Sequence, residues 1–319
     1  MVERGLLDLM LSRLGELSQR EKILLCELFN TERDLIQKSK ADIETIIGHE
    51  LAAFWKIDSI RALAERDAAA ARSRGINMVS WQSPAYPPLL REINDPPVLL
   101  FFRGVLPNPE APLAAVVGTR KPSPQAAAQA FDIAKGLARG GISVVSGLAF
   151  GIDAAAHRGN IEGGAPTIAV LGSGVDEVYP SSNRQLARRI LETGGALLSE
   201  YPPGASPRKW TFPARNRIIA GLSRGVLIVE APRKSGALIT ARFTLDYNRD
   251  LWVASAGVAE EQNRARFDRR GTTKLAEDGA QIIQAASDIL RAWNREEVPN
   301  DMEFASSLAH SLAITNVTL

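Results

Sequence analysis

Four short segments rich in small residues recur in the chain, each directly after a short apolar run. They are Gly118-Thr119, leading to Arg120; Ser146-Gly147, leading to Gly151-Ile152-Asp153; Gly172-Ser173-Gly174; and Ser235-Gly236. Each precedes a stretch with helical character, so unpaired backbone N–H groups and the positive end of a helix can meet an anion there. Glycine also lets a backbone approach a phosphate closely. One such loop is often only a turn, but four of them at one edge of a sheet indicate a phosphate-binding platform.

The usual nucleotide motifs do not fit these loops. The pattern G-x-x-x-x-G-K-[ST] of a P-loop is not present in the sequence. A dinucleotide site needs G-x-G-x-x-G after the first strand and an acidic residue near the end of the second. Here Arg120 and Lys121 stand where the glycines are needed, and the second apolar run ends in Ser146-Gly147. The sequence therefore disfavours a nicotinamide enzyme, and we expect no cofactor.

Basic and aromatic residues alternate around the same loops. Arg120 and Lys121 follow the first run, Arg208 and Lys209 precede Trp210-Thr211-Phe212-Pro213, Arg215-Asn216-Arg217 follows, and Arg233-Lys234 precedes Ser235. This pattern suits a single nucleic-acid strand, because cations meet phosphates and rings stack on bases. The candidates for stacking are Phe150, Tyr179, Trp210 and Phe212.

Two other interpretations of these side chains stay open. Trp210 and Phe212 could instead fill the core beneath a long loop. Arg215 or Arg217 could pair with Glu230 or Glu200 to brace that loop.

The sequence shows no catalytic or metal-binding constellation. Its three histidines, His49, His157 and His310, have no metal-ligand spacing and join no Ser/His/Asp arrangement. Cys26 is the only cysteine, which excludes a disulfide framework and a cysteine-based zinc site. We expect Asp153 to be a first-turn acid of the helix after Gly151. We expect His157 to be a packed or capping residue.

Six apolar runs alternate with helical segments and must position these loops. The runs are Leu113–Val117, Ile142–Val145, Thr167–Leu171, Ala196–Ser199, Val226–Glu230 and Leu251–Ala254. Short continuous apolar strands separated by helices are typical of a parallel sheet that is covered on both faces. The predicted fold class is therefore α/β, a doubly wound Rossmann-like sheet with ligands at the carboxyl ends of its strands.

The predicted organisation has four parts. Residues 1–80 form a small helical domain, with helix starts at Thr31 and Ser39, each followed three residues later by an aspartate. Residues 81–110 are rich in proline and are predicted to be a linker that wraps onto the next domain, with a strand at Val98–Phe102. Residues 111–295 form the Rossmann-like domain, in which Ala259–Gly271 is a charged, solvated loop. Residues 296–319 form a tail without clear periodicity.

Composition limits the location and the partners. Of the 319 residues, 45% are hydrophobic and 23% charged, and the formal net charge is +2, so a basic patch has to be local. The first residues do not form a signal-peptide pattern, and no apolar run reaches the roughly 18 residues that a membrane span needs. We expect a cytoplasmic protein without membrane contact.

Several long motifs, in one order, resemble those of the DNA-processing protein A (DprA, or Smf) family. They are YPPLLREINDPPVLLFFRG, VVGTRKPS, VVSGLAFGIDAAAH, TIAVLGSGVDEVYPSSN, LLSEYPPG, FPARNRIIAGLSRGVLIVEA and SGALITA. The likeness extends from about Tyr86 to Trp252, and the helical N-terminus is similar in kind to the family's sterile-alpha-motif-like domain.

The resemblance implies an extended Rossmann fold that binds single-stranded DNA without cutting it. It also implies protection of incoming strands, loading of a RecA-type recombinase in natural transformation, and a homodimer. By the family's motifs, Arg120 lies in the basic DNA pocket, and two segments surround it: Ser146, Gly147, Ala149, Gly151, Ile152 and Asp153 line it, and Phe212, Arg215, Asn216 and Arg217 border it.

The chain departs from the family in two places. At Ala254–Gly257 and Gly271–Lys274 it lacks the family's proline-glycine turn and its serine-glycine-threonine-asparagine segment, so the binding edge is expected to differ there. Many members carry a C-terminal winged helix, for which this chain is expected to be too short.

The function expected from both lines of reasoning is a non-enzymatic, single-stranded DNA-binding recombination mediator. In it, Arg120, Lys121, Arg215 and Arg217 contact phosphates while the small-residue loops supply N–H donors. The alternative is a nucleotide sensor or a phosphoribohydrolase-like enzyme on the same platform. The P-G-G-x-G-T motif of the lysine-decarboxylase-like phosphoribohydrolases is not present.

Overall fold

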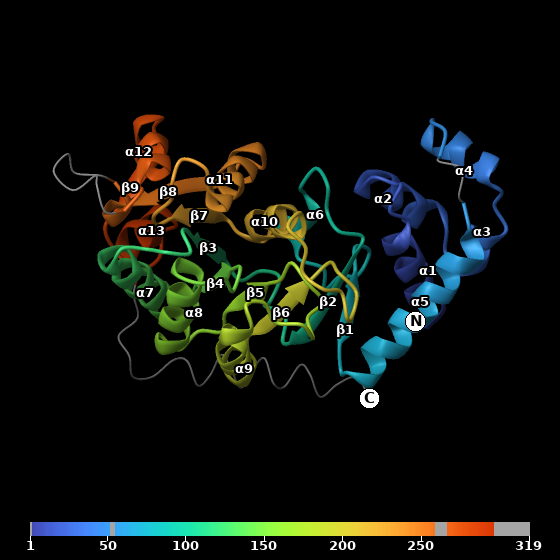
Figure 1. Ribbon diagram of the computed structural model, residues 1–319, viewed down its shortest axis with the longest axis horizontal. Coiled ribbons are helices and arrows are strands. Elements are labelled where there is room, and N and C mark those ends of the chain that lie inside the picture. The colour runs from blue at the N-terminus through green and yellow to red at the C-terminus, as the bar shows by residue number, and fades with distance from the viewer. Residues whose placement is uncertain (1, 52–54, 259–266, 297–319) are drawn as a thin grey trace.

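The computed structural model describes residues 2–51, 55–258 and 267–296 (Figure 1). Most of the predicted charged loop at 259–271 and the predicted tail, apart from residue 296, lie outside the described residues. Within the described part of the chain, no helix has the length and apolar character that a membrane span requires.

A single sheet of nine strands crosses the described residues in the order β1-β2-β6-β5-β4-β3-β7-β8-β9. The strands are β1 (Asn77–Ser80), β2 (Leu99–Gly104), β3 (Leu113–Val117), β4 (Ser143–Ser146), β5 (Ile168–Val170), β6 (Ala196–Ser199), β7 (Gly225–Ile228), β8 (Asp250–Ala254) and β9 (Gln281–Ile283). From β6 to β9 all neighbours pair in parallel. All six strands predicted for the Rossmann-like part are present, so the predicted fold class is confirmed.

The strand of the proline-rich segment belongs to this sheet. β2 pairs antiparallel with β6, Phe101 opposite Ser199, and β1 pairs antiparallel with β2. The sequence predicted the strand in β2 but placed it in a linker, and it predicted neither β1 nor β9. Both missed strands are short and largely exposed, so neither shows the apolar run on which the prediction depended.

Alternate residues of β3 face two separate apolar layers. Ala114 and Val116 pack with helices α7 (Pro124–Arg139), α8 (Ile152–Glu162) and α13 (Ala286–Ala292). Leu113, Ala115 and Val117 pack with α6 (Pro88–Arg91), α10 (Thr211–Leu222) and α11 (Gly236–Asp246). Helices thus cover both faces of the sheet, which explains why its central strands are apolar throughout.

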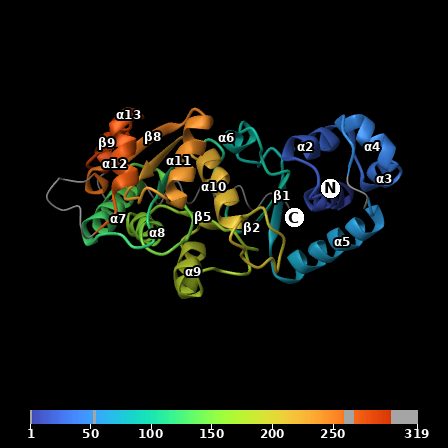
Figure 2. The same ribbon diagram turned by 45° about the horizontal axis from the view of Figure 1, so that its top comes forward.

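Five helices form the N-terminal part, at the end of the molecule next to β1 and β2 (Figures 1 and 2). They are α1 (Val2–Arg13), α2 (Gln19–Leu28), α3 (Glu32–Ile36), α4 (Lys40–Ile47) and α5 (Ile57–Ser73). Capping boxes begin α3 at Thr31 and α4 at Ser39, as predicted. The apolar core of these helices continues through β2 to Leu171 and Leu197.

Two further helices complete the described elements around the sheet. α9 (Arg184–Glu192) follows a short 3-10 turn after β5, and α12 (Arg270–Glu277) lies between β8 and β9. At the opposite end of the sheet from the N-terminal helices, α12, β9 and α13 lie together (Figure 1).

Candidate nucleic-acid interface

The four small-residue loops share one edge of the sheet. They follow β5, β4, β3 and β7, which are parallel neighbours in that order. Parallel strands end on the same side, so the predicted common edge is confirmed. Between β3 and β7 the winding of the chain reverses direction, and in open α/β sheets ligands bind at such a point.

One exposed cation lies against an aromatic pair at this edge. The guanidinium carbon of Arg120, which is exposed, lies 5.5 Å from the ring centre of Phe212. Phe212 is the second residue of α10, and its ring centre is 5.5 Å from that of Tyr179, in the loop after β5. The distance from Arg120 to Phe212 is within the range of a cation–π contact. Three segments far apart in the sequence therefore bring a cation and two rings together.

Several large rings at this edge are open to solvent. Trp210 is 59% exposed, Phe150 49% and Tyr179 48%. The edge of the Trp210 ring faces Tyr201, with 6.0 Å between ring centres. The interpretation that Trp210 fills the core is therefore wrong, whereas Phe212 is half-buried.

The basic residues of the motifs divide into two groups. Six are exposed: Arg120, Lys121, Arg208, Lys209, Arg233 and Lys234. Arg215 and Arg217, both in α10, are buried. Only the exposed group has side chains in contact with solvent that a phosphate could approach.

Arg215 holds two strand ends together. Its guanidinium donates to the carbonyl oxygen of Gly147, at 2.9 Å, to that of Val170, and to the amide oxygen of Asn216, at 3.0 Å. Burial lowers the pKa of Arg215 to about 10, and the nearby Asp153 opposes that shift. A Cβ at Gly147 would overlap the Arg215 guanidinium, which explains the glycine at this position.

Asn216 and Arg217 extend this bracing. The Asn216 amide donates to the carbonyl oxygen of Gly236 at 2.9 Å, which joins α10 to the start of α11. Arg217 contacts Glu200 at 2.6 Å and Asp95 at 2.9 Å. Burial by itself lowers the pKa of Arg217, but these two carboxylates raise the pKa above its ordinary value.

These contacts correct the expected roles of the two arginines. Both were expected to contact phosphates, but each guanidinium is directed into the protein by contacts with carbonyl or carboxylate oxygens. The alternative interpretation, that Arg217 pairs with Glu200, is confirmed. The segment Phe212–Arg217 thus borders the site through Phe212, and its arginines support the loops from below.

Asp153 organises the loop after β4. Its buried carboxylate accepts the N–H groups of Gly147, at 3.1 Å, and Ala149, at 3.3 Å. Burial raises the pKa of Asp153 against the lowering influence of Arg215 and of these hydrogen bonds. Ser146 is also buried and donates its hydroxyl to the Val116 carbonyl at 2.7 Å. The predicted first-turn role of Asp153 is confirmed.

Several backbone N–H groups of the loops already donate hydrogen bonds to other groups of the protein. Gly147 donates to Asp153, Thr119 donates to the Glu230 carbonyl, and Lys121 donates to the Thr119 hydroxyl. Gly151 has a φ of +76°, and a Cβ there would lie 2.4 Å from the Thr119 carbonyl oxygen. The expectation that these small-residue loops supply N–H donors to phosphates is therefore corrected for Thr119, Lys121 and Gly147. The small residues at 147 and 151 instead allow close packing between loops.

The remaining predicted residues start α11 or lie against other segments. The Ser235 hydroxyl caps α11 by accepting the Ala237 N–H at 3.1 Å, and Gly236 is exposed. Gly118 lies against Ile152, and Gly172 lies against Phe212 and Thr211.

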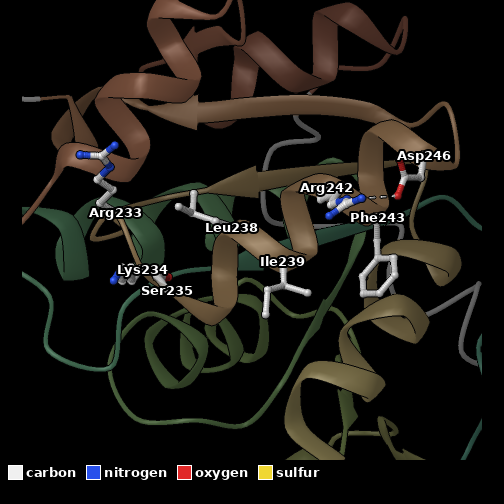
Figure 3. A pocket seen from close by; sticks show the side chains of 8 residues that line it. All are labelled: Arg233, Lys234, Ser235, Leu238, Ile239, Arg242, Phe243 and Asp246. Atoms are coloured by element: carbon white, nitrogen blue, oxygen red, sulfur yellow. Dashed lines mark ion pairs between the residues drawn. The ribbon is translucent and has the colours of Figure 1, made fainter. Parts of the chain in front are cut away.

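Beside Ser235, a pocket is lined by residues of α11 and of the loop before it (Figure 3). Arg233, Lys234 and Arg242 contribute cations to it, and Leu238, Ile239 and Phe243 contribute apolar groups.

His157 is a packed residue, as expected. Its Nδ1 lies 2.8 Å from the Thr167 hydroxyl, which itself donates to the Val144 carbonyl. Burial and the neighbouring Arg215 lower the pKa of His157 to about 3. Across the residues that the structure describes, no three His, Cys, Asp or Glu side chains gather in a way that could hold a metal ion.

Sequence reasoning missed a buried cluster at the point where the winding reverses. The Glu230 carboxylate accepts the Ser123 N–H at 2.9 Å, the Ser123 hydroxyl at 2.7 Å and the Arg269 Nε–H at 3.1 Å. Arg269 stands in the charged segment that was predicted to be a solvated loop, yet its side chain is only 13% exposed. A sequence offers no signal for this contact, because the partners are 39 and 146 residues apart.

Comparison with known proteins places the chain in a family. Residues 77–294 match the sequence model of a family described as DNA recombination-mediator protein A. The chain is 44% identical over 212 residues to protein Smf of Synechocystis, a match that covers 65% of this chain and 51% of that protein. It is 38% identical over 232 residues to the DNA processing protein DprA of Bacillus subtilis, covering 72% and 74%. The matched region therefore spans about half of the Synechocystis relative.

Solved structures give the same result. The X-ray structure of DNA processing protein A from Streptococcus pneumoniae aligns with a TM-score of 0.69 at 33% identity, covering 88% of this chain and 95% of that one. A structure of the Helicobacter pylori protein, described by its single-stranded DNA binding mode, aligns with a TM-score of 0.58 at 28% identity, covering 68% and 95%. The family model spans well over half of the chain, and the predicted resemblance is confirmed: this protein belongs to the DNA recombination-mediator protein A family, also known as DprA or Smf.

Proposed function

We propose that this protein is a recombination mediator that binds single-stranded DNA along the carboxyl edge of its sheet. The observation that carries the proposal is the exposed Arg120 guanidinium over the Phe212 ring, with Tyr179 beside it. Cations take the phosphates and rings take the bases, a combination that suits single strands. The relative from Helicobacter pylori, whose structure is described by its single-stranded DNA binding mode, supports the same ligand.

The arrangement favours a single strand over a duplex. In a duplex the bases are already stacked on one another, so they cannot stack on Trp210, Tyr179 or Phe150. These rings are roughly half exposed or more, and Tyr179 and Trp210 are oriented by neighbouring rings. Preorganised rings lose little side-chain freedom on binding.

Binding without cleavage agrees with the state of the titratable groups of α8. Asp153 and His157 are buried and hydrogen-bonded within the protein, so neither is placed to act on a phosphodiester. We therefore propose a non-enzymatic role. The two rival roles differ in outcome: a phosphoribohydrolase-like enzyme would release free base from nucleoside monophosphates, and a small-nucleotide sensor would bind them without releasing it.

We further propose that the protein protects incoming strands in the cytoplasm and loads a RecA-type recombinase during natural transformation. A protein partner needs exposed apolar surface, and α11 offers Ile239 and Leu245, which are 37% and 61% exposed. We also propose a homodimer. β9 is the last strand of the described sheet and exposes Ile282, and an unpaired strand edge is suited to contact with a second copy.

The experiment is a salt titration of binding to labelled oligo-dT and to its duplex. We expect preference for the single strand, with log K falling by about 0.7 per phosphate contact for each tenfold rise in salt. Arg120→Ala should weaken binding and reduce that slope by about 0.7, because it removes one phosphate contact. The matched control is Arg188→Ala, which removes an exposed arginine of α9 outside the four loops.

The outcomes separate the candidate functions. Equal binding to the duplex, or no binding, would refute the single-strand proposal. Free base released from nucleoside monophosphates would support the enzymatic rival instead. Unchanged affinity in a folded Arg120→Ala variant would remove Arg120 from the site.

A further inference from the structure

Glu230 holds the basic loop after β3 at both of its ends. At one end its backbone carbonyl accepts the Thr119 N–H at 2.7 Å. At the other end its carboxylate accepts the Ser123 N–H and the Ser123 hydroxyl, at 2.9 and 2.7 Å. Arg120 and Lys121 lie between these two attachments, and both side chains are exposed. The position of the two cations therefore depends on the position of Glu230.

The Glu230 carboxylate is buried, with a residue exposure of 1%. A buried charge is strongly unfavourable unless it is paired and hydrogen-bonded. Arg269 supplies the positive charge that pairs with Glu230. Its Nε–H donates to Glu230 at 3.1 Å, and its Nη2 donates to the Ser123 hydroxyl at 3.1 Å. The Arg269 guanidinium thus contacts both Glu230 and Ser123.

The backbone next to Arg269 is itself fixed to the segments that follow β7 and β8. The Gly271 N–H donates to the Ala231 carbonyl at 2.9 Å, and the Thr272 hydroxyl donates to the Gly257 carbonyl. Arg269 therefore reaches Glu230 from a firmly attached segment. The next residue, Arg270, differs: its side chain is 74% exposed and pairs with Asp268.

We propose that Arg269 is a positioning residue for DNA binding: by pairing with Glu230 and Ser123, it holds the loop that presents Arg120 and Lys121. The proposal rests on the proposed single-stranded DNA function. Arg269 does not itself reach the DNA, because its guanidinium is directed inward. Its effect on binding passes through the loop.

The test compares Arg269→Ala with Arg270→Ala. Both variants remove one positive charge from adjacent positions, but only the first removes the contacts with Glu230 and Ser123. Hydrogen exchange of peptides covering residues 118–126 reports the loop without any DNA. We expect at least tenfold faster exchange there in Arg269→Ala, and wild-type exchange in Arg270→Ala. Equal exchange in the two variants would refute the proposal.

Binding to oligo-dT supplies the second readout. We expect Arg269→Ala to bind about tenfold more weakly, the equivalent of about one charge-assisted hydrogen bond, and Arg270→Ala to bind within about twofold of wild type. In an Arg120→Ala background, Arg269→Ala should lose part of its effect, because Arg120 is one of the two cations that the loop presents. A fully additive effect would contradict positioning through Arg120.

A conservative variant covers the case in which Arg269→Ala does not fold. Arg269→Lys keeps a charge beside Glu230 but cannot donate in the same geometry to both Glu230 and Ser123. In Arg269→Lys, the amide hydrogens of residues 118–126 should exchange faster than in Arg270→Lys. Where Arg269→Ala folds, Arg269→Lys should bind DNA more tightly than Arg269→Ala does. Exchange equal to that of Arg270→Lys would overturn the proposal. If the wild type does not bind oligo-dT, the proposed function fails, and the exchange comparison alone still decides whether Arg269 holds the loop.

Discussion

Two glycines of the strand-end loops should respond oppositely to a single added methyl group. A Cβ at Gly147 would lie 2.5 Å from the guanidinium carbon of Arg215 and 2.6 Å from its Nη1. A Cβ at Gly236 meets nothing closer than the Asn216 amide nitrogen, at 3.9 Å. Gly147→Ala therefore has to displace a buried guanidinium, while Gly236→Ala adds a methyl group to the first turn of a helix.

The magnitude follows from the contacts that Arg215 would lose. Its guanidinium donates to the carbonyls of Gly147 and Val170, and hydrogen bonds of charged groups contribute about 1.5–3 kcal/mol each. Removing one partner of a buried charged pair typically lowers the free energy of unfolding by roughly 3–5 kcal/mol. We expect Gly147→Ala to lower the free energy of unfolding by about 3–5 kcal/mol. Gly236→Ala should change it by less than about 1 kcal/mol, towards greater stability, because alanine has less freedom in the unfolded chain.

Urea unfolding followed by circular dichroism would measure both variants against wild type. A Gly147→Ala protein within about 1 kcal/mol of wild type would refute the reasoning. It would mean that Arg215 leaves its internal contacts easily, and Arg215 would then return to the set of residues available to phosphates. Gly236→Ala also probes the interface itself: reduced oligo-dT affinity at wild-type stability would show that DNA approaches this backbone closely.

Three further predictions concern single side chains. Trp210→Ala should weaken oligo-dT binding by about 1–3 kcal/mol, the contribution of one stacked base, and leave the melting temperature unchanged because the ring is 59% exposed; unchanged affinity would exclude Trp210 from stacking. Arg217→Ala should lower the free energy of unfolding by about 3 kcal/mol, because Glu200 and Asp95 lose their partner; a variant with wild-type stability and lost DNA affinity would show a direct contact instead. The folded-state pKa of His157, about 3, is below its ordinary 6.5, so its contribution to stability is complete above pH 6.5 and declines as the pH falls towards 3. Between pH 7.5 and 5.5 that decline in the free energy of unfolding is about 1.4 kcal/mol. Urea unfolding of His157→Gln should not show this decline. The comparison with wild type separates the histidine from Asp153, whose raised pKa changes stability with pH in the opposite sense.

The parallel strands and their loops were predictable because both depend on local pattern. β3 and β6 begin and end where the apolar runs of the sequence do. Since parallel strands end on one side, the common edge of the four loops followed from the strand assignment alone. The edge strands β1 and β9 were missed because short, exposed strands carry no such pattern.

The sequence could not separate the exposed cations from the buried ones. Arg120 and Arg215 both follow small or aromatic residues in basic motifs, yet one is exposed and the other donates to the Gly147 carbonyl. Burial depends on what the fold places on top of a residue. That is decided by segments tens of residues away, such as the end of β5 over Arg215.

By itself, the sequence determined the α/β class, the edge that carries the loops, the family and the residue types that could bind a single strand. The tertiary structure alone decided which of them face solvent, and it brought Arg269 to Glu230 and Phe212 to Arg120. The physical reason is the range of the interactions. Strand and helix patterns arise between near neighbours in the chain, whereas ion pairs and ring contacts form between groups that are adjacent only after the chain has folded.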